Sequence, residues 1–187
     1  MKKVILLSFA LIAITSAFSQ ITTLSDAELG FGLEAAVPMS GLKETQKTGI
    51  GGSVKFGYGF PNSNLAITTQ AGFLSFAGKP IDNTSSPLKQ TYAPQSFVPI
   101  KAGLRYTFGG GIYAEPQLGG ALIFSEDESG NPVNTSGLMY AMAVGFQTLP
   151  GIDINVHYDC VNFSNGNIAF AGVRLAYHFT FRRQEIY

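Results

Sequence analysis

The chain has 187 residues, with 12 basic and 12 acidic side chains, so its formal net charge is zero. A balanced charge gives no electrostatic reason to expect a nucleic acid or an acidic partner, and the length fits one domain. Glycine (22 residues) and aromatic residues (12%) are plentiful, while charged residues make up only 13%. This composition is unusual for a soluble domain and natural for a β-structure with a lipid-facing wall.

The first twenty residues, "MKKVILLSFALIAITSAFSQ", have the pattern of an export signal. Lys2 and Lys3 precede an apolar run over 4–15, and Ala17-Phe18-Ser19 fits a small-x-small cleavage site. We therefore expect a cleaved signal peptide over 1–19 and an outer-membrane β-barrel domain over 20–187. The residue directly after the cleavage site is Gln20 and not a cysteine, so no lipid anchor is expected.

The rest of the chain contains eight segments in which apolar and polar residues alternate, as in strands with two different faces. No stretch of the mature chain is apolar for long enough to form a transmembrane helix. Each segment has about the length that a tilted strand needs to cross a bilayer. The segments run over 27–38, 48–60, 65–76, 96–108, 112–124, 137–148, 152–162 and 167–181.

The connections between these segments are alternately short and long. The short ones are 61–64, 109–111 and 149–151, and the longer, polar ones are 39–47, 77–95 and 125–136. Short turns at one end and long loops at the other are typical of outer-membrane barrels with periplasmic termini. The last connection, 163–166, is shorter than this pattern predicts.

Alternation divides the segments into an apolar face and a polar face. Eleven ionisable residues share the polar face: Glu28, Glu34, Lys55, Lys101, Arg105, Glu115, Asp153, His157, Asp159, Arg174 and His178. The opposite positions are mostly Leu, Ile, Val and Phe, and no charged residue falls among them.

Two features indicate that the apolar face is outside. Aromatic residues gather near both ends of the segments, for example Tyr106 and Phe108 at one end and Phe73 and Phe124 at the other, as in the aromatic bands of membrane barrels. The polar face is also rich in small residues, which are needed where side chains crowd a barrel axis. They are Gly30, Gly32, Gly51, Gly57, Gly103, Gly119, Ala141, Ala143 and Gly145.

Three residues need separate comment. Pro99 and Pro116 fall within segments although a closed barrel has no edge strand, so each predicts a bulge or a wrong strand limit. Cys160 is the single cysteine and has no disulfide partner in the chain. We interpret it as a small apolar residue on the outer face.

The stretch "SFVPIKAGLRYTFGGGIYAEPQLGGALIF" (96–124) resembles the porin-like outer-membrane β-barrel proteins of Gram-negative bacteria. The matching residues are Phe97, Val98, Pro99, Ile100 and Lys101, then Tyr113, Glu115, Pro116 and Gly119. The resemblance implies a small barrel of the OmpX or OmpA type and accommodates both prolines. The chain departs from the pattern by continuing with "RRQEIY" after the aromatic end of the last segment.

The eleven ionisable residues are expected to form a structural network inside the barrel, because an unpaired buried charge is costly. The turn positions predict that Arg105 lies opposite Glu115 and that Arg174 lies opposite Asn155. Lys55 is expected near Gly32 and Glu34. An eight-stranded barrel is only wide enough for side chains, so an open pore is not expected.

A catalytic site is the alternative for one part of this network. Some small outer-membrane barrels modify lipid A, and His157 has Asp153, Asp159 and Ser164 close by in the sequence. The His-x-Ser spacing of lipid A deacylases is absent, because position 159 is Asp. We therefore expect no enzyme activity, no catalytic residues, no cofactor and no metal site.

The sequence as a whole predicts an all-β, eight-stranded, antiparallel up-and-down transmembrane barrel in the outer membrane. We expect it to be a monomer with a structural or surface-interaction role, in contact with outer-membrane lipid and lipopolysaccharide. Loops 77–95, which contains Lys79, Lys89 and Tyr92, and 125–136 are the candidate contacts to another envelope protein. A narrow channel or small-solute transporter, a lipid A-modifying enzyme and a soluble periplasmic sandwich are the alternatives.

Overall fold

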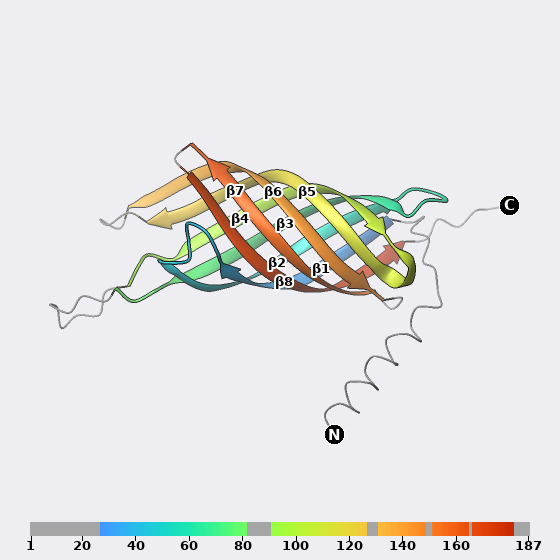
Figure 1. The fold of residues 1–187 in the computed structure, drawn as a ribbon, viewed down its shortest axis with the longest axis horizontal. Coiled ribbons are helices and arrows are strands. Elements are labelled where there is room, and N and C mark those ends of the chain that lie inside the picture. The colour runs from blue at the N-terminus through green and yellow to red at the C-terminus, as the bar shows by residue number, and fades with distance from the viewer. Residues whose placement is uncertain (1–26, 82–90, 127–130, 149–150, 165, 182–187) are drawn as a thin grey trace, which may run out of the picture.

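The structure is a computed structural model, and it describes residues 27–81, 91–126, 131–148, 151–164 and 166–181. The predicted signal peptide, Lys89 and the "RRQEIY" tail lie outside these residues. Eight antiparallel strands form one closed barrel in which each strand pairs with its neighbours in the sequence (Figure 1). None of the described stretches forms a helix that is long and apolar enough to cross a membrane.

The strands are close to the eight predicted segments. They are β1 (Ala27–Pro38), β2 (Gln46–Gly59), β3 (Leu65–Gly78), β4 (Gln95–Thr107), β5 (Ile112–Glu126), β6 (Pro132–Gln147), β7 (Ile152–Phe163) and β8 (Gly166–Phe181). The predicted fold class is therefore confirmed. A short 3-10 turn, η2 (Gly109–Gly111), joins β4 to β5 with Gly110 at φ 78° and Gly111 at φ 83°, conformations that favour glycine.

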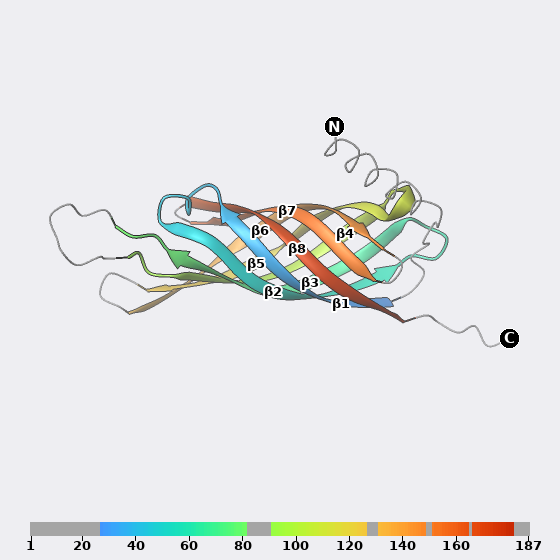
Figure 2. The same ribbon diagram turned by 90° about the horizontal axis from the view of Figure 1, so that it is seen from below.

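Pairing of the first and last strands closes the barrel. Their register runs without interruption from Ala27 opposite Phe181 to Pro38 opposite Phe170. β1 begins and β8 ends at the same end of the barrel as the tight connections, which we call the turn end (Figure 2). The opposite end, where the connections are longer, is the loop end.

Apolar side chains cover the outside of the barrel and charged side chains fill part of its inside. Leu33, Ile50 and Ile100 are 74%, 71% and 60% exposed on the outer wall. The eleven ionisable residues that the sequence places on the polar face are at most 7% exposed. This is the reverse of a soluble protein, in which charged side chains face water and apolar ones are buried.

Pro99 and Pro116 lie within intact strands, so neither a bulge nor a wrong strand limit explains them. The register of β3 with β4 is the same before and after Pro99 but has a gap at that position, while Pro99 remains paired with Ala121 of β5. The register of β4 with β5 has a similar gap at Pro116, which remains paired with Met142 of β6. Each proline therefore interrupts one ladder only, on the side where its missing N–H would have pointed.

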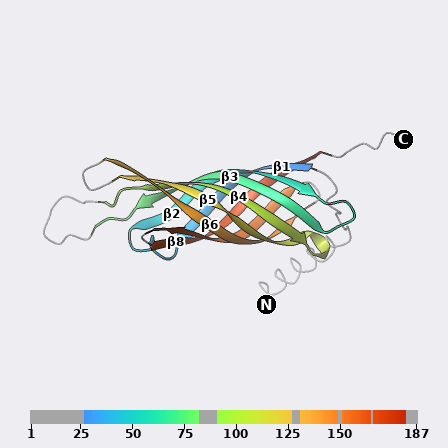
Figure 3. The ribbon, with the colours of Figure 1, turned by 90° about the horizontal axis from the view of Figure 1, so that it is seen from above.

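The β5–β6 hairpin is longer than the sequence predicts. β5 continues to Glu126 and β6 starts at Pro132, so most of the expected loop 125–136 is strand. At the loop end the hairpin extends beyond β7 and β8, as does the connection between β3 and β4 (Figure 3). We predicted a loop because residues 125–136 are mostly polar. A hairpin that projects from the barrel has both faces exposed, so its strands need no apolar face.

Cys160 lies on the outward side of β7, as predicted, but is only 3% exposed. It is opposite Tyr140 of β6 and Ala169 of β8. The position is therefore part of the outer wall without being an open surface site.

Candidate functional site

The turn-end half of the barrel contains an ionic network centred on Arg105. Its Nε donates to Glu115 Oε2 at 2.9 Å and its Nη1 donates to Glu28 Oε1 at 2.8 Å. Lys55 Nζ is 2.7 Å from Glu115 Oε2, so Glu115 receives two cations. Arg105 also stacks on the ring of Tyr113, 4.3 Å from its centroid.

His178 and Asp153 complete this part of the network. The two imidazole nitrogens of His178 lie 3.5 Å from Glu28 and 3.4 Å from Asp153. The Tyr113 hydroxyl donates to Asp153 at 2.9 Å, and Arg105 Nη2 is 3.6 Å from the same carboxylate. The named partners of these three carboxylates come from β2, β4, β5 and β8.

A second set of ionic contacts lies nearer the middle of the barrel. Lys101 Nζ is 2.8 Å from Asp159 Oδ1, and His157 Nε2 is 3.3 Å from Asp159 Oδ2. Arg174 Nε donates to Ser53 at 2.9 Å and lies 3.7 Å from Glu34.

Two predicted neighbour relations agree with the register and one does not. The β4–β5 pairs on either side of the gap at Pro116 place Arg105 across from Glu115, and the two side chains are hydrogen-bonded. Arg174 is paired with Asn155. Lys55 lies opposite Gly30, and its ammonium group reaches across the interior to Glu115 instead of Glu34. The prediction for Lys55 was wrong because alternation gives the face of a residue, while contacts across the axis depend on how all eight strands are staggered.

Glycines opposite the bulky interior groups make this packing possible. A Cβ atom on Gly30 would lie 2.6 Å from the His178 ring, and one on Gly172 would lie 2.3 Å from His157 Nε2. Such distances are far below van der Waals contact. Gly30, which the sequence placed inside, and Gly172, which it did not single out, therefore leave the space that the two histidines occupy.

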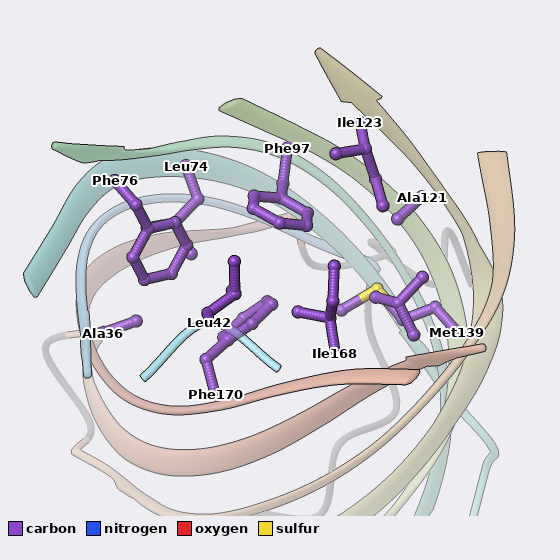
Figure 4. Close-up of a cluster of buried hydrophobic side chains, with 11 residues drawn as sticks. Ala36, Leu42, Leu74, Phe76, Phe97, Ala121, Ile123, Met139, Ile168 and Phe170 are labelled. Carbon is purple, nitrogen blue, oxygen red and sulfur yellow. The ribbon is translucent and has the colours of Figure 1, made fainter. Parts of the chain in front are cut away.

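The loop-end half of the interior is apolar, which the sequence reasoning missed. Phe76, Phe97 and Phe170 pack against one another with ring centroids 5.5 to 5.7 Å apart. Leu42, from the connection between β1 and β2, points into the same cluster and is 1% exposed (Figure 4). The apolar cluster comprises Ala36, Leu42, Leu74, Phe76, Phe97, Ala121, Ile123, Met139, Val161, Ile168 and Phe170.

A signal for this cluster is present in the sequence. Phe97 and Val161 occupy the same alternate positions as the ionisable residues of their own strands, but nearer the loop end. Leu74 continues in the same way the inward positions of the polar residues Thr68 and Gln70 in β3. Apolar residues therefore replace polar ones on the inward face of these strands toward that end. The apolar cluster and the ionic network therefore follow one another along the inside of the barrel.

The catalytic arrangement considered for His157 is not assembled. His157 contacts Asp159 and Asn155, whereas Asp153 is bound by Tyr113 and lies near His178. Ser164 is exposed in the turn after β7. Among the described residues, no serine hydroxyl is hydrogen-bonded to His157.

The projecting hairpin is the second candidate site. β5 and β6 remain paired up to Glu126 opposite Pro132, while the pairing of β6 with β7 starts only at Leu138. Within the described part of the chain, residues 132–137 of β6 therefore have a strand neighbour on one side only. Val133 to Ser136 are exposed, so this backbone edge is accessible.

Part of the long connection after β3 is also ordered. Pro80 and Thr91 form an isolated bridge, and Lys79 Nζ donates to the Lys43 carbonyl of the neighbouring connection. Gln46 donates to the Ala93 carbonyl at 3.0 Å. These contacts join the bases of two connections at the loop end.

Comparison with known proteins found no matching family model and no curated relative. Among solved structures, the barrel is similar to Ail, the attachment invasion locus protein of Yersinia pestis, with a TM-score of 0.58 and 15% identity over 83% of this chain and 99% of that one. It is also similar to Neisserial surface protein A, with a TM-score of 0.59 and 13% identity over 83% and 97%.

A third similar structure is the N-terminal β-barrel domain of Pseudomonas aeruginosa OprF, with a TM-score of 0.54 and 11% identity over 81% of this chain and 97% of that one. At sequence identities this low, structural similarity establishes a shared fold but no shared activity. On this evidence the chain has the fold of the small, eight-stranded outer-membrane β-barrel proteins.

Proposed function

We propose that this chain is an outer-membrane barrel without an open pore that makes contacts at the cell surface through its loop end. The observation that carries this proposal is the free edge of β6 on the projecting hairpin. An exposed strand edge presents unpaired N–H and C=O groups, to which an extended segment of another polypeptide can add as a further strand.

Photocrosslinking in cells tests this role. A photoreactive amino acid at Thr135, on the free edge, is expected to give a covalent adduct with another envelope or surface protein. The same amino acid at Ile100, on the outer wall, is the control and is expected to give no such protein adduct. Equal protein adducts from both positions, or none from Thr135, would contradict the proposal.

Two hairpin variants distinguish binding by the free edge of β6 from binding by the tip of the hairpin. Replacing residues 124–134 by an Asn-Gly turn joins Ile123 to Thr135, which are already paired, and removes half of the free edge, residues 132–134. This variant is expected to lose the adduct-forming partner in a pull-down. Replacing 127–130 by glycine and serine keeps the edge and is expected to retain the partner.

The filled interior supports the absence of a pore. Arg105, Glu115 and Asp153 are fully buried at the turn end, and three phenylalanines pack across the loop end. An ion would have to displace both layers to cross. The purified barrel is expected to give no steady openings in planar bilayers, and regular single-channel steps would instead support the transport alternative.

We propose no catalytic function, because His157 is not joined to a nucleophile. Incubation of the folded protein with lipid A is expected to leave the lipid unchanged. Detection of a deacylated or acylated product would support the enzyme alternative.

A further inference from the structure

Three lysines, which we call the lysine cluster, lie together at the loop end of the barrel. Lys43 is in the connection between β1 and β2, Lys47 is near the start of β2, and Lys79 directly follows β3. Among the residues that the structure describes, they are the only basic side chains outside the interior network. β2 lies four strands from β6 in either direction around the barrel, so the lysine cluster is on the side opposite the projecting hairpin.

The connection that carries Lys43 is anchored to the barrel. The Leu42 side chain is buried in the apolar cluster, and its carbonyl accepts hydrogen bonds from the Thr45 amide at 3.2 Å and the Gln46 amide at 2.9 Å. Lys79 binds the same connection, because its amide donates to the Thr45 carbonyl at 2.8 Å and its ammonium group donates to the Lys43 carbonyl. Lys43 and Lys79 are therefore neighbours on one anchored base.

An irregular stretch of β2 places Lys47 beside them. Gln46 is paired with Gly78, after which the register of β2 with β3 shifts until Gly49. Lys47 lies in this stretch, next to the pair that directly precedes Lys79, and its side chain is exposed. Bulges are frequent at the rims of barrels, where they redirect a side chain. The shift therefore adds a third ammonium group to the base formed by the two connections.

The protein itself does not neutralise the lysine cluster. All ion pairs between described residues lie in the interior, so in this part of the chain none of the three ammonium groups is paired with a carboxylate. Glu44 lies in the same connection and is exposed. Three lysines and one glutamate give the patch a net charge of +2.

The lysine cluster lies directly beyond the lipid-facing part of the wall. Ile50, three residues after Lys47, is 71% exposed, and Phe73, six residues before Lys79, is 50% exposed. Aromatic residues mark the headgroup level, and lysines at the border of an apolar wall extend their ammonium groups to that level. The loop end of an outer-membrane barrel faces the outer leaflet, in which lipopolysaccharide carries phosphate groups on its lipid A.

We propose that the lysine cluster binds a phosphate group of lipid A. Ammonium groups make short, charge-assisted hydrogen bonds to phosphate oxygens, and here they lie at the depth of the headgroups. The proposal assigns a site and not a general property of the rim, because the rest of the described rim has no lysine or arginine. One position around the barrel is therefore expected to hold lipid A more tightly than the others.

An acidic protein is a poorer occupant of this patch. The lysine cluster lies at the bases of the connections, where Lys79 contacts the Lys43 carbonyl, and not at their tips. Carboxylates of another protein would have to reach past the connections to the membrane surface. The proposal goes beyond the surface role assigned to the β6 edge and is independent of it, since the two sites are on opposite sides of the barrel.

Native mass spectrometry tests the proposal on the mature chain, folded in detergent with added lipid A that carries both phosphates. The wild type is expected to retain one lipid A and to retain the dephosphorylated lipid at least about tenfold less. Lys43→Gln combined with Lys47→Gln removes two exposed charges. Retention is expected to fall roughly twentyfold, since each basic residue near a membrane surface contributes a factor of about five.

Two glutamate variants provide a matched control. Glu44→Gln removes the carboxylate within the patch and is expected to strengthen retention of lipid A. Glu126→Gln makes the same change of charge on the opposite hairpin and is expected to leave retention unchanged. Folding of every variant is checked by the mobility of unheated samples on gels.

Three results would overturn the proposal. They are equal retention of lipid A and its dephosphorylated form, unchanged retention in the folded double lysine variant, and equal effects of Glu44→Gln and Glu126→Gln. Displacement of lipid A by an equal concentration of inorganic phosphate would overturn it as well, because the patch would then be a site for free anions.

Discussion

At the scale of single residues, the interior is organised by charges that have no access to water. Glu115 is fully buried and is the shared partner of Lys55 and Arg105. Removing one member of a buried ion pair leaves the other charge uncompensated, which costs more than the pair contributes when intact. The loss of unfolding free energy on removing one such charge therefore measures how much the network stabilises the barrel.

Glu115→Gln is expected to lower the free energy of unfolding in detergent by roughly 3–5 kcal/mol, because two buried cations lose their carboxylate. The measurement is the unfolding midpoint in denaturant, followed by circular dichroism. Glu126→Gln removes an exposed carboxylate near the hairpin tip and is the control with little expected effect. An equal midpoint for the two variants would show that the network contributes nothing.

Close backbone approach gives a second prediction for a single residue. A Cβ atom on Gly119 would lie 2.0 Å from the Ile100 carbonyl oxygen, which belongs to the neighbouring strand and cannot rotate away. Gly119→Ala is expected to destabilise the barrel by roughly 1–3 kcal/mol, as overpacked sites do. Gly109→Ala is the control, since nothing lies within 4 Å of its Cβ position. Similar unfolding midpoints for both variants would contradict this account.

At the scale of strands, the sequence predicts more than it does for individual contacts. Alternation identified all eight strands and their outward faces, because a closed barrel with a lipid-facing wall imposes a period of two on every strand. Turn positions also gave the neighbours of Arg105 and Arg174, since a hairpin's register follows from its turn. Contacts across the interior, such as Lys55 with Glu115, are 60 residues apart and depend on the stagger of the whole barrel.

The change from ionic to apolar packing along the axis was missed for a related reason. Position along the barrel axis is set by strand tilt and stagger, so Phe170 of β8 meets Phe76 and Phe97 of the paired strands β3 and β4 across the interior. The length of the β5–β6 hairpin was underestimated because its projecting part has no apolar face to reveal a strand.

The apolar cluster yields a prediction at this scale. Phe97→Ala leaves a cavity between β3, β4 and β8 and is expected to cost roughly 3–5 kcal/mol of stability. Phe124→Ala, near the same end but 40% exposed on the outer wall, is expected to cost much less. Both are measured as unfolding midpoints in the same detergent. A smaller loss for Phe97→Ala than for Phe124→Ala would contradict the assignment of the cluster as a core.

At the scale of the whole molecule, the account depends on which face of the sheet meets lipid. The closed register, the exposed apolar wall and the buried charges are consequences of one arrangement, in which the barrel has no free edge within the membrane and keeps its charges inside. The β6 edge becomes free only where the hairpin leaves the barrel, at the loop end.

The most direct test of this arrangement uses the absence of tryptophan from the chain. Leu33, Ile100 and Val156 are replaced by tryptophan one at a time, and each variant is folded into phospholipid vesicles. If the apolar wall faces lipid, the tryptophan fluorescence of each variant is quenched by lipids brominated in their acyl chains and is unaffected by iodide in the buffer. Quenching by iodide together with insensitivity to the brominated lipids would show that the apolar wall faces water, and would contradict it.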